Sequence, residues 1–305
     1  MKPRIVLAGG SGLIGQSLSP FLISKNYKVI VLTRTESNQR GAVRKAHWDG
    51  KTLGDWIQFV NGAAAVMNLT GRSINCRHTP ENRREIIDSR VDSVRVLGQA
   101  IERCAQPPQV FVQCAGVGIY GDKGKRLCDE TTATGDDFVA EVCQRWEAAF
   151  DSVHASKTRK VLLRLGVMLG PKGGFLEVLG RLTRWFLGGQ VGSGRQYISW
   201  IHITDLSRMV LAGVENQELT GTFNATSPNP VPNAEFMREL RRALHRPWSP
   251  PVPEFAARIG SWLMGTEADL ALVSQRCVPK RFIEKGFEFE FPTLHQALAD
   301  IFPHQ

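Results

Sequence analysis

The sequence predicts an α/β protein built on a Rossmann-type, doubly wound parallel sheet, with a smaller, partly helical lobe toward the C-terminus. Two observations support this prediction. Short apolar strand patterns alternate with amphipathic helix patterns through the first two-thirds of the 305 residues, as expected for a parallel sheet covered on both faces. The first strand pattern, at 4–8, runs directly into three glycines spaced three residues apart, which is typical of the first turn of such a sheet.

Each glycine of this turn has its own expected role. Gly9 lets the chain turn sharply, Gly12 leaves no side chain between the backbone and a pyrophosphate, and Gly15 lets a helix at 13–23 pack closely on the strand. The helix N-terminus presents free N–H groups to phosphates. A second strand pattern at 28–32 completes the βαβ unit in which the spacing indicates dinucleotide binding. The predicted cofactor-binding residues of the turn are Gly9, Gly10, Ser11, Gly12, Leu13, Ile14 and Gly15.

The end of the second strand bears on which dinucleotide is bound. An NAD-selective site has an Asp or Glu about 20 residues past the glycines, which accepts hydrogen bonds from the ribose 2′-hydroxyl. Here the strand ends with Thr33 and Arg34, and a guanidinium suits the oxygens of a 2′-phosphate. The sequence therefore favours NADP(H) over NAD(H). Two alternatives remain, because Arg34 could be a solvated strand-end residue and Glu36 could supply the carboxylate.

The remaining elements follow in order along the chain. Strand patterns are expected near 45–48, 64–69, 110–112 and 160–164, and helices at 79–101 and 137–150. Thr79 and Pro80 give the first of these helices a capping residue and a favourable first-turn residue.

Beyond Gly170 the alternation breaks. A helix follows Gly173 and Gly174, a glycine-rich stretch occupies 188–194, and a last strand at 222–225 is expected to return to the sheet. We predict a Rossmann domain of residues 1–167 with 201–227, and a substrate or partner lobe of residues 168–200 with 228–305.

Composition excludes several classes of protein. The net charge is +9, but the arginines cluster on amphipathic helices without interleaved aromatic residues, so we expect no nucleic-acid partner. The six cysteines show no metal-ligand or disulfide spacing, and no metal site is predicted. No apolar run is long enough to span a bilayer, and no signal pattern precedes the first strand. We expect a cytoplasmic protein without a membrane partner.

Several segments together resemble the extended short-chain dehydrogenase/reductase superfamily: the glycine turn, Asn68-Leu69-Thr70-Gly71, Ile119-Tyr120-Gly121-Asp122, and the run from Trp200 to Leu206. More narrowly, the chain resembles the atypical, YfcH-like group of epimerase family proteins. The narrower match lies in Arg145-Trp146-Glu147, Gly192-Ser193-Gly194-Arg195-Gln196 and Pro279-Lys280-Arg281.

The resemblance implies where a cofactor lies and which residues perform catalysis. NADP(H) would lie along the carboxyl ends of the strands, with the glycine turn under the pyrophosphate, Arg34 at the 2′-phosphate, and Leu69, Thr70 and Gly71 beside the ribose. The superfamily also has a catalytic Tyr with a Lys four residues later, which lowers the pKa of the phenol.

The chain departs from that catalytic pattern. None of its three tyrosines is followed by a lysine four residues later. Val139 stands at the Tyr position and Cys143 at the Lys position, and Arg90 stands where the superfamily has Asn.

Two residues are therefore candidates for catalysis, and each has a structural alternative. Cys143 could be a nucleophile if an arginine lowered its pKa, or a small packing residue. Tyr120 could donate a proton near the nicotinamide, or pack in the core. Arg90, Arg164 and Arg195 are candidates for a substrate cleft suited to an anionic ligand, although Arg164 could equally be a buried, paired arginine.

The sequence leaves two functions open. One is an NADP(H)-dependent oxidoreductase or epimerase that acts on an unidentified small molecule. The alternative is a non-catalytic NADP(H)-binding regulatory protein, linked to cell division, with a protein partner or a homodimer.

Overall fold

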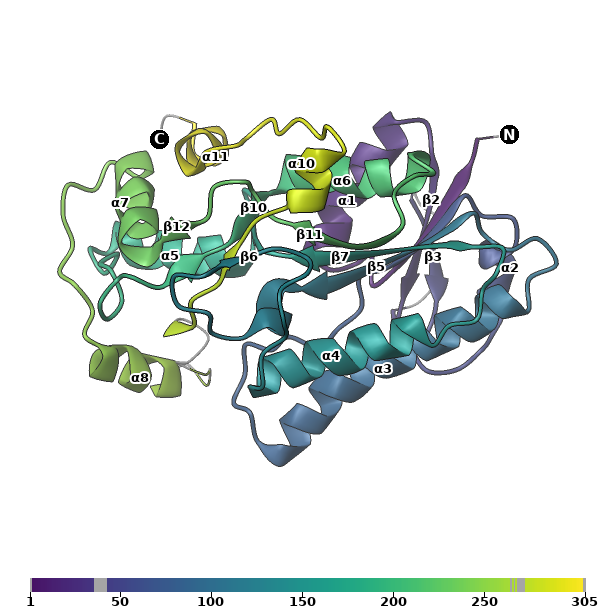
Figure 1. Cartoon of the computed structure of the whole chain (residues 1–305), viewed down its shortest axis with the longest axis horizontal. Coiled ribbons are helices and arrows are strands. Elements are labelled where there is room, and N and C mark those ends of the chain that lie inside the picture. The colour runs from purple at the N-terminus through teal and green to yellow at the C-terminus, as the bar shows by residue number, and fades with distance from the viewer. Residues whose placement is uncertain (1, 36–42, 264, 266, 268–271, 304–305) are drawn as a thin grey trace.

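The computed structural model describes residues 2–35, 43–263, 265, 267 and 272–303. Its centre is a seven-stranded, all-parallel sheet in the order β11-β7-β5-β4-β1-β2-β3 (Figure 1). The predicted doubly wound α/β fold is therefore confirmed. The strands are β1 (Arg4–Ala8), β2 (Lys28–Thr33), β3 (Val43–His47), β4 (Ala65–Asn68), β5 (Val110–Gly116), β7 (Arg159–Leu165) and β11 (Gly221–Ala225).

Helices cover both faces of the sheet (Figure 1). One face packs against α2 (Ile57–Val60), α3 (Pro80–Glu102) and α4 (Phe138–Asp151). The other face packs against α1 (Leu13–Ser24), α6 (Ile203–Glu215) and α10 (Lys280–Glu284). Because both faces are covered, the central strands are apolar on both sides, as β1 is from Ile5 to Ala8.

The helix boundaries agree with the capping signals in the sequence. The hydroxyl of Thr79 accepts a hydrogen bond from the Asn82 N–H, and Pro80 opens α3. At α4, the Asp137 carboxylate accepts from the Ala140 N–H at 2.9 Å. Each cap satisfies a helix N–H that has no partner within the helix.

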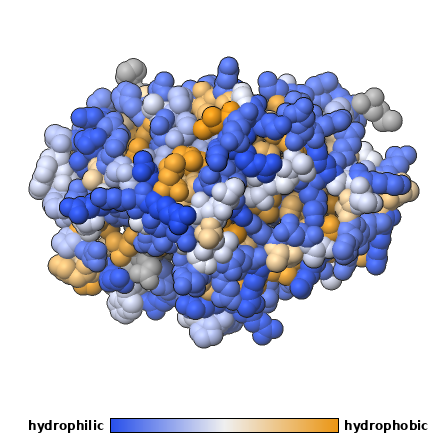
Figure 2. Space-filling model, viewed as in Figure 1, coloured by the Kyte–Doolittle hydropathy of each residue, from blue (hydrophilic) through white to orange (hydrophobic). Residues whose placement is uncertain are grey.

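A further hydrophobic cluster, apart from those on the two faces of the sheet, lies beyond the carboxyl end of the sheet. Figure 2 shows hydrophobic residues at the lower left of the molecule, where Figure 1 places α8 with its exposed Phe255 and Ile259. The remaining elements outside the main sheet and its covering helices are η1 (Val117–Tyr120), β6 (Leu127–Cys128), β8 (Val167–Leu169), α5 (Gly174–Arg184), β9 (Tyr197–Ile198), β10 (Trp200–His202), β12 (Val231–Pro232), α7 (Asn233–Ala243), α8 (Glu254–Leu263), β13 (Arg276–Cys277) and α11 (Leu294–Ile301).

The expected return of the chain to the sheet occurs at β11, which pairs in parallel with β7. β10, which is separated from β11 by α6, pairs with β8 outside the main sheet. The division into two lobes at the boundaries given above stays a prediction. Among the described residues, no helix has the length and apolar character needed to cross a bilayer.

Candidate functional site

The three spaced glycines have different structural roles in the turn between β1 and α1. Gly9 has a φ of +73°, a conformation that favours glycine. A Cβ atom on Gly15 would lie 2.4 Å from the Cα of Gly10, so α1 packs directly on the turn. A Cβ on Gly12 would meet only the carbonyl oxygen of Gly9, at 3.3 Å. Gly15 is therefore needed for packing, whereas Gly12 borders open space.

The open side of Gly12 coincides with an uncapped helix N-terminus. No side chain caps α1 at Gly12, and no acidic residue lies in its first turn. Such an end attracts anions through its free N–H groups and its dipole. The described residues at this turn therefore fit a phosphate group.

The loop after β4 adds a second observation. The Thr70 hydroxyl is buried and has no hydrogen-bond partner, and a Cβ on Gly9 would lie 3.0 Å from its oxygen. A buried hydroxyl without a partner is costly in a folded protein. Thr70 thus offers a polar group beside the glycine turn, where the ribose of a dinucleotide was expected.

Buried amides hold this loop in place. Asn68 donates to Ser93 Oγ and Gln113 Oε1, both at 3.0 Å, and its own oxygen accepts from the Thr70 N–H at 3.0 Å. The Leu69 N–H donates to the carbonyl of Ala8. The loop therefore has a fixed position next to β1.

The end of β2 places hydroxyl groups and one cation near the same turn. Thr33 Oγ1 lies 3.4 Å from Ser11 Oγ and 3.1 Å from Thr35 Oγ1. The Arg34 side chain is exposed, and no contact of its guanidinium is recorded among the described residues. The alternative carboxylate, Glu36, lies outside the described residues.

Arg90, an expected cleft residue, binds backbone carbonyls. Its Nη1 donates to the carbonyls of Arg72 and Ile86, both at 2.9 Å, and its guanidinium lies over the Trp146 ring at 4.9 Å. A Cβ on Gly71 would lie 3.0 Å from the guanidinium carbon. Arg90 therefore positions the loop at 69–72.

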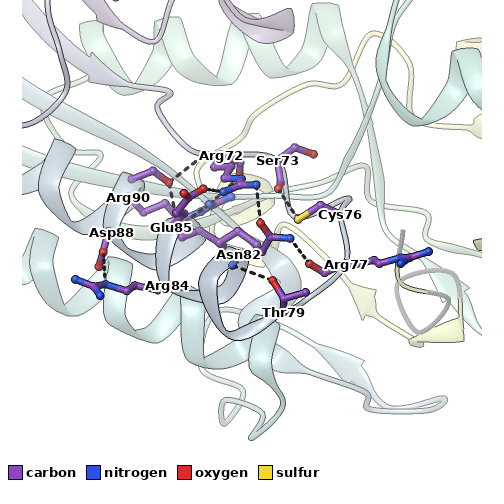
Figure 3. Close-up of polar contacts among 12 residues, drawn as sticks. Arg72, Ser73, Cys76, Arg77, Thr79, Asn82, Arg84, Glu85, Asp88 and Arg90 are labelled. Carbon is purple, nitrogen blue, oxygen red and sulfur yellow. Dashed lines mark hydrogen bonds and ion pairs between the residues drawn. The ribbon is translucent and has the colours of Figure 1, made fainter. Parts of the chain in front are cut away.

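The next part of this loop is tied to α3 (Figure 3). Arg72 pairs with Glu85 and donates to Asn82 Oδ1 at 2.7 Å. The Asn82 amide donates in turn to the Arg77 carbonyl at 2.7 Å. These side-chain contacts, which come from residues the sequence analysis did not single out, fix the edge of the candidate site.

Cys143 lies where α4 meets the end of β5. A Cβ on Gly118 would lie 2.6 Å from Val139 Cγ1 and 3.7 Å from Cys143 Sγ, so both side chains fill the contact. Burial raises the pKa of the Cys143 thiol to about 12, against the opposing effect of the Arg90 charge. A protonated, buried thiol is a weak nucleophile, and these observations favour the packing alternative.

Tyr120 is fully buried, and its hydroxyl is held by two partners. It donates to Asn224 Oδ1 at 2.7 Å and accepts from Arg164 Nη1 at 2.9 Å. Burial raises the pKa of the phenol, although the Arg164 charge opposes this. The proton-donor role of Tyr120 stays a prediction, and its contacts favour the packing alternative.

Arg164 forms a two-pronged ion pair with Glu147 on α4. Its Nε and Nη2 lie 2.9 and 2.8 Å from the two carboxylate oxygens, and both side chains are nearly buried. This is the paired arginine that the sequence left as an alternative to a cleft residue. Glu147 itself was missed as a partner, although its place on the buried side of α4, four residues after Cys143, was a usable signal.

Arg195 alone among the three expected cleft arginines is exposed, and it lines a hollow of about 210 Å³. Lys125 and the acidic residues Asp122 and Glu254 line it as well. Asp122 belongs to a segment noted only for its resemblance to the superfamily, whereas Lys125 and Glu254, the first residue of α8, carry no recognisable motif. The hollow therefore presents both basic and acidic side chains to a polar ligand.

His202 and Asp205, in the run from Trp200 to Leu206 that carries part of the resemblance, form hydrogen bonds that fix neighbouring segments. His202 caps α6 by accepting from the Thr204 N–H at 3.3 Å. The fully buried Asp205 accepts from the backbone N–H groups of Glu290 and Phe291 at 2.8 and 2.9 Å. It therefore ties the C-terminal segment to α6.

Known proteins match nearly the whole length of this chain. The NAD dependent epimerase/dehydratase family matches residues 5–225, and a domain of unknown function matches residues 252–301. A chloroplastic SDR39U1 homolog from Arabidopsis thaliana is 35% identical over 97% of this chain and 86% of its own length. The Bacillus subtilis epimerase family protein YfhF is 33% identical over 98% and 97%. Because one relative is chloroplastic, a cytoplasmic location stays a prediction.

A solved structure agrees with these relatives. The human epimerase family protein SDR39U1, crystallised with NADPH, superposes with a TM-score of 0.87 at 29% identity, over 98% of both chains. UDP-N-acetylglucosamine 4-epimerase from Bacillus cereus shares the fold, with a TM-score of 0.76 at 18% identity. The chain belongs to the NAD dependent epimerase/dehydratase family.

Proposed function

We propose that this chain binds NADP(H) at the turn between β1 and α1 and uses it on an anionic small molecule, as an atypical oxidoreductase or epimerase. The observation that carries the proposal is the uncapped N-terminus of α1 beside Gly12, with the unpartnered Thr70 hydroxyl next to it. The human relative crystallised with NADPH supports the choice of cofactor.

The described residues assign parts of the cofactor to parts of the site. The N–H groups of α1 would hold the pyrophosphate, and Thr70 would hydrogen-bond the ribose. Arg34, exposed at the end of β2, would bind the 2′-phosphate. Gly173, the N-cap of α5, and Gly174, its first residue, lie against the Leu13 side chain and would cover the pyrophosphate from the other lobe. Bound NADP(H) supplies or accepts a hydride.

Arg195 and Lys125 are the basic residues that we propose for substrate binding. Both line the hollow of about 210 Å³, and no ion pair of either side chain is recorded among the described residues. Because Arg90 and Arg164 are held by other groups, they would act as positioning residues.

A second function rests on a separate observation. Tyr120 and Cys143 are buried, and burial raises the pKa of both. Neither is poised to give a proton to a substrate. This favours the alternative of a non-catalytic protein in which bound NADP(H) stabilises a surface for a partner.

Calorimetric titration with NADPH and NADH tests the cofactor proposal. We expect NADPH to bind more tightly, and equal or tighter binding of NADH would overturn the role given to Arg34. Consumption of NADPH in a panel of anionic carbonyl compounds and nucleotide sugars then separates the two functions. Turnover that is lost in Arg195→Ala supports substrate binding in the hollow, whereas binding without turnover supports the regulatory alternative.

A further inference from the structure

Two helices of the C-terminal lobe, α5 and α7, end side by side at an exposed surface. The guanidinium of Arg246, just after α7, lies 5.2 Å from the ring centre of Phe186, just after α5. Arg241 Nη1 donates to the Gly188 carbonyl at 2.8 Å. These contacts hold the two helix ends together.

Three consecutive apolar residues, Trp185, Phe186 and Leu187, are exposed at this place, and Trp248 is exposed two residues beyond Arg246. The exposed fractions are 76% for Trp185, 49% for Phe186, 55% for Leu187 and 65% for Trp248. We call these four residues the apolar tip. Single exposed apolar residues are common on protein surfaces, but a contiguous group indicates an interaction site.

The backbone at the tip is strained. Phe186 has a φ of +60° and follows the end of α5, where the Leu187 N–H donates to the Leu182 carbonyl at 2.9 Å. Glycine is the usual residue at this position of a helix end, because a side chain there is crowded. A bulky aromatic residue in this conformation is a genuine outlier, and such strain is often kept at functional sites.

Basic residues surround the tip. The segments 178–191 and 240–253 contain five arginines and no acidic residue. We call these arginines the basic rim: Arg181, Arg184, Arg241, Arg242 and Arg246. Glu177 and Glu239, on the preceding turns of α5 and α7, pair with Arg181 and Arg242.

We propose that the apolar tip and the basic rim form a docking surface for a bilayer that contains anionic phospholipids. Tryptophan and phenylalanine favour the boundary between headgroups and acyl chains, and arginines favour lipid phosphates. The combination fits a lipid surface better than a second copy of this chain. A two-fold contact through the tip would bring the five arginines of each copy against those of the other.

This proposal departs from the expectation that the protein has no membrane partner. That expectation rested on the absence of an apolar run long enough to span a bilayer. A surface-bound tip needs no such run, because only a few side chains enter the interface.

Co-sedimentation with vesicles tests the proposal on the full-length protein. We expect binding to vesicles of equimolar phosphatidylglycerol and phosphatidylcholine, little binding to phosphatidylcholine alone, and release at high salt because surface charges are screened. Tryptophan emission should shift to shorter wavelength on binding. No binding, or equal binding to both kinds of vesicle, would overturn the proposal.

Variants separate docking from folding. Trp185→Ser combined with Leu187→Ser should weaken vesicle binding at least about tenfold, since each apolar side chain loses its transfer into the interface. Arg184→Gln and Arg242→Gln should each weaken binding to anionic vesicles about fivefold. Ile283→Ser, on α10, removes an apolar residue outside the tip whose exposed fraction, 50%, is close to the 55% of Leu187, and should leave vesicle binding unchanged.

Phe186→Gly best distinguishes docking from folding, because it should change stability and vesicle binding in opposite directions. Glycine relieves the strained φ, so the melting temperature should rise, while vesicle binding should fall. A variant that is more stable and still binds vesicles fully would overturn the role of the tip. If the wild type instead forms a dimer that the Trp185 and Leu187 double variant abolishes, as measured by light scattering, the surface is a protein interface and the lipid proposal is wrong.

Discussion

At the scale of single residues, cofactor selectivity depends on Arg34. Its side chain is exposed at the end of β2 and has no recorded partner among the described residues, so its guanidinium suits charge-assisted hydrogen bonds with a 2′-phosphate. Arg34→Ala should weaken NADPH binding by about 1–3 kcal/mol and leave NADH binding unchanged. Fluorescence titration with both cofactors measures the difference. Lys28→Ala, at the opposite end of the same strand, is the matched control, and an equal loss in that variant would point to a general charge effect.

Tyr120 allows structural and catalytic roles to be told apart. Tyr120→Phe removes the hydroxyl that joins Arg164 to Asn224 and leaves two buried polar groups without that partner. We expect a loss of about 1–3 kcal/mol in the free energy of unfolding, measured with urea, and unchanged NADPH affinity. A fully stable variant that loses NADPH turnover would instead assign Tyr120 to catalysis.

At the scale of elements, two glycines of the turn between β1 and α1 allow the effects on cofactor binding and on folding to be measured separately. A Cβ on Gly12 meets one carbonyl oxygen at 3.3 Å, whereas a Cβ on Gly15 would overlap the backbone of Gly10. Gly12→Ala should therefore keep the melting temperature of the wild type and lose NADPH affinity. Gly15→Ala should lose stability because α1 must move away from the turn. Thermal unfolding with and without NADPH checks both variants, and similar stability of the two would contradict the assignment.

These elements also show what sequence alone can predict. The glycine turn, the strands and the capped helix α3 can be predicted from the spacing of glycines, apolar residues and capping residues. These signals come from residues that lie close together in the sequence. The ion pair of Arg164 with Glu147 joins β7 to α4, and the hydrogen bonds of Asp205 reach residues 290 and 291. Such contacts depend on which faces the fold brings together. For this reason the charge of Arg164 alone did not reveal whether it faces a cleft or a partner.

His202, which caps α6, should make the stability of the protein depend on pH. Burial lowers the pKa of His202, although nearby Asp300 and Asp205 oppose this. The unfolded chain therefore binds the proton more readily than the folded protein, and the stability from the neutral ring is lost as the pH falls below the usual histidine value near 6.5. His202→Asn keeps an acceptor for the cap and removes the titration. The melting temperature of this variant should fall less than that of the wild type between about pH 7 and pH 5; parallel curves would contradict the prediction.

At the scale of the whole molecule, α5 connects two regions that we assign to different ligands. Its first residues lie against Leu13 beside the cofactor turn, and its end carries the apolar tip. A helix of 11 residues spans about 16 Å. The two proposed sites therefore lie at opposite ends of one helix.

The last prediction concerns turnover by the complete protein. Carbonyl reduction needs a proton for the developing alkoxide, and a positioned acid contributes about 10²–10⁴-fold. Val139 has no proton to give, Cys143 is buried with a raised pKa, and the Tyr120 hydroxyl is committed to Arg164 and Asn224. We therefore expect NADPH to raise the melting temperature, while dehydrogenase turnover stays far below the common range of about 1–10³ s⁻¹. Turnover within that range that survives both Tyr120→Phe and Cys143→Ala would show that the proton comes from another group, such as a residue lining the hollow at Arg195.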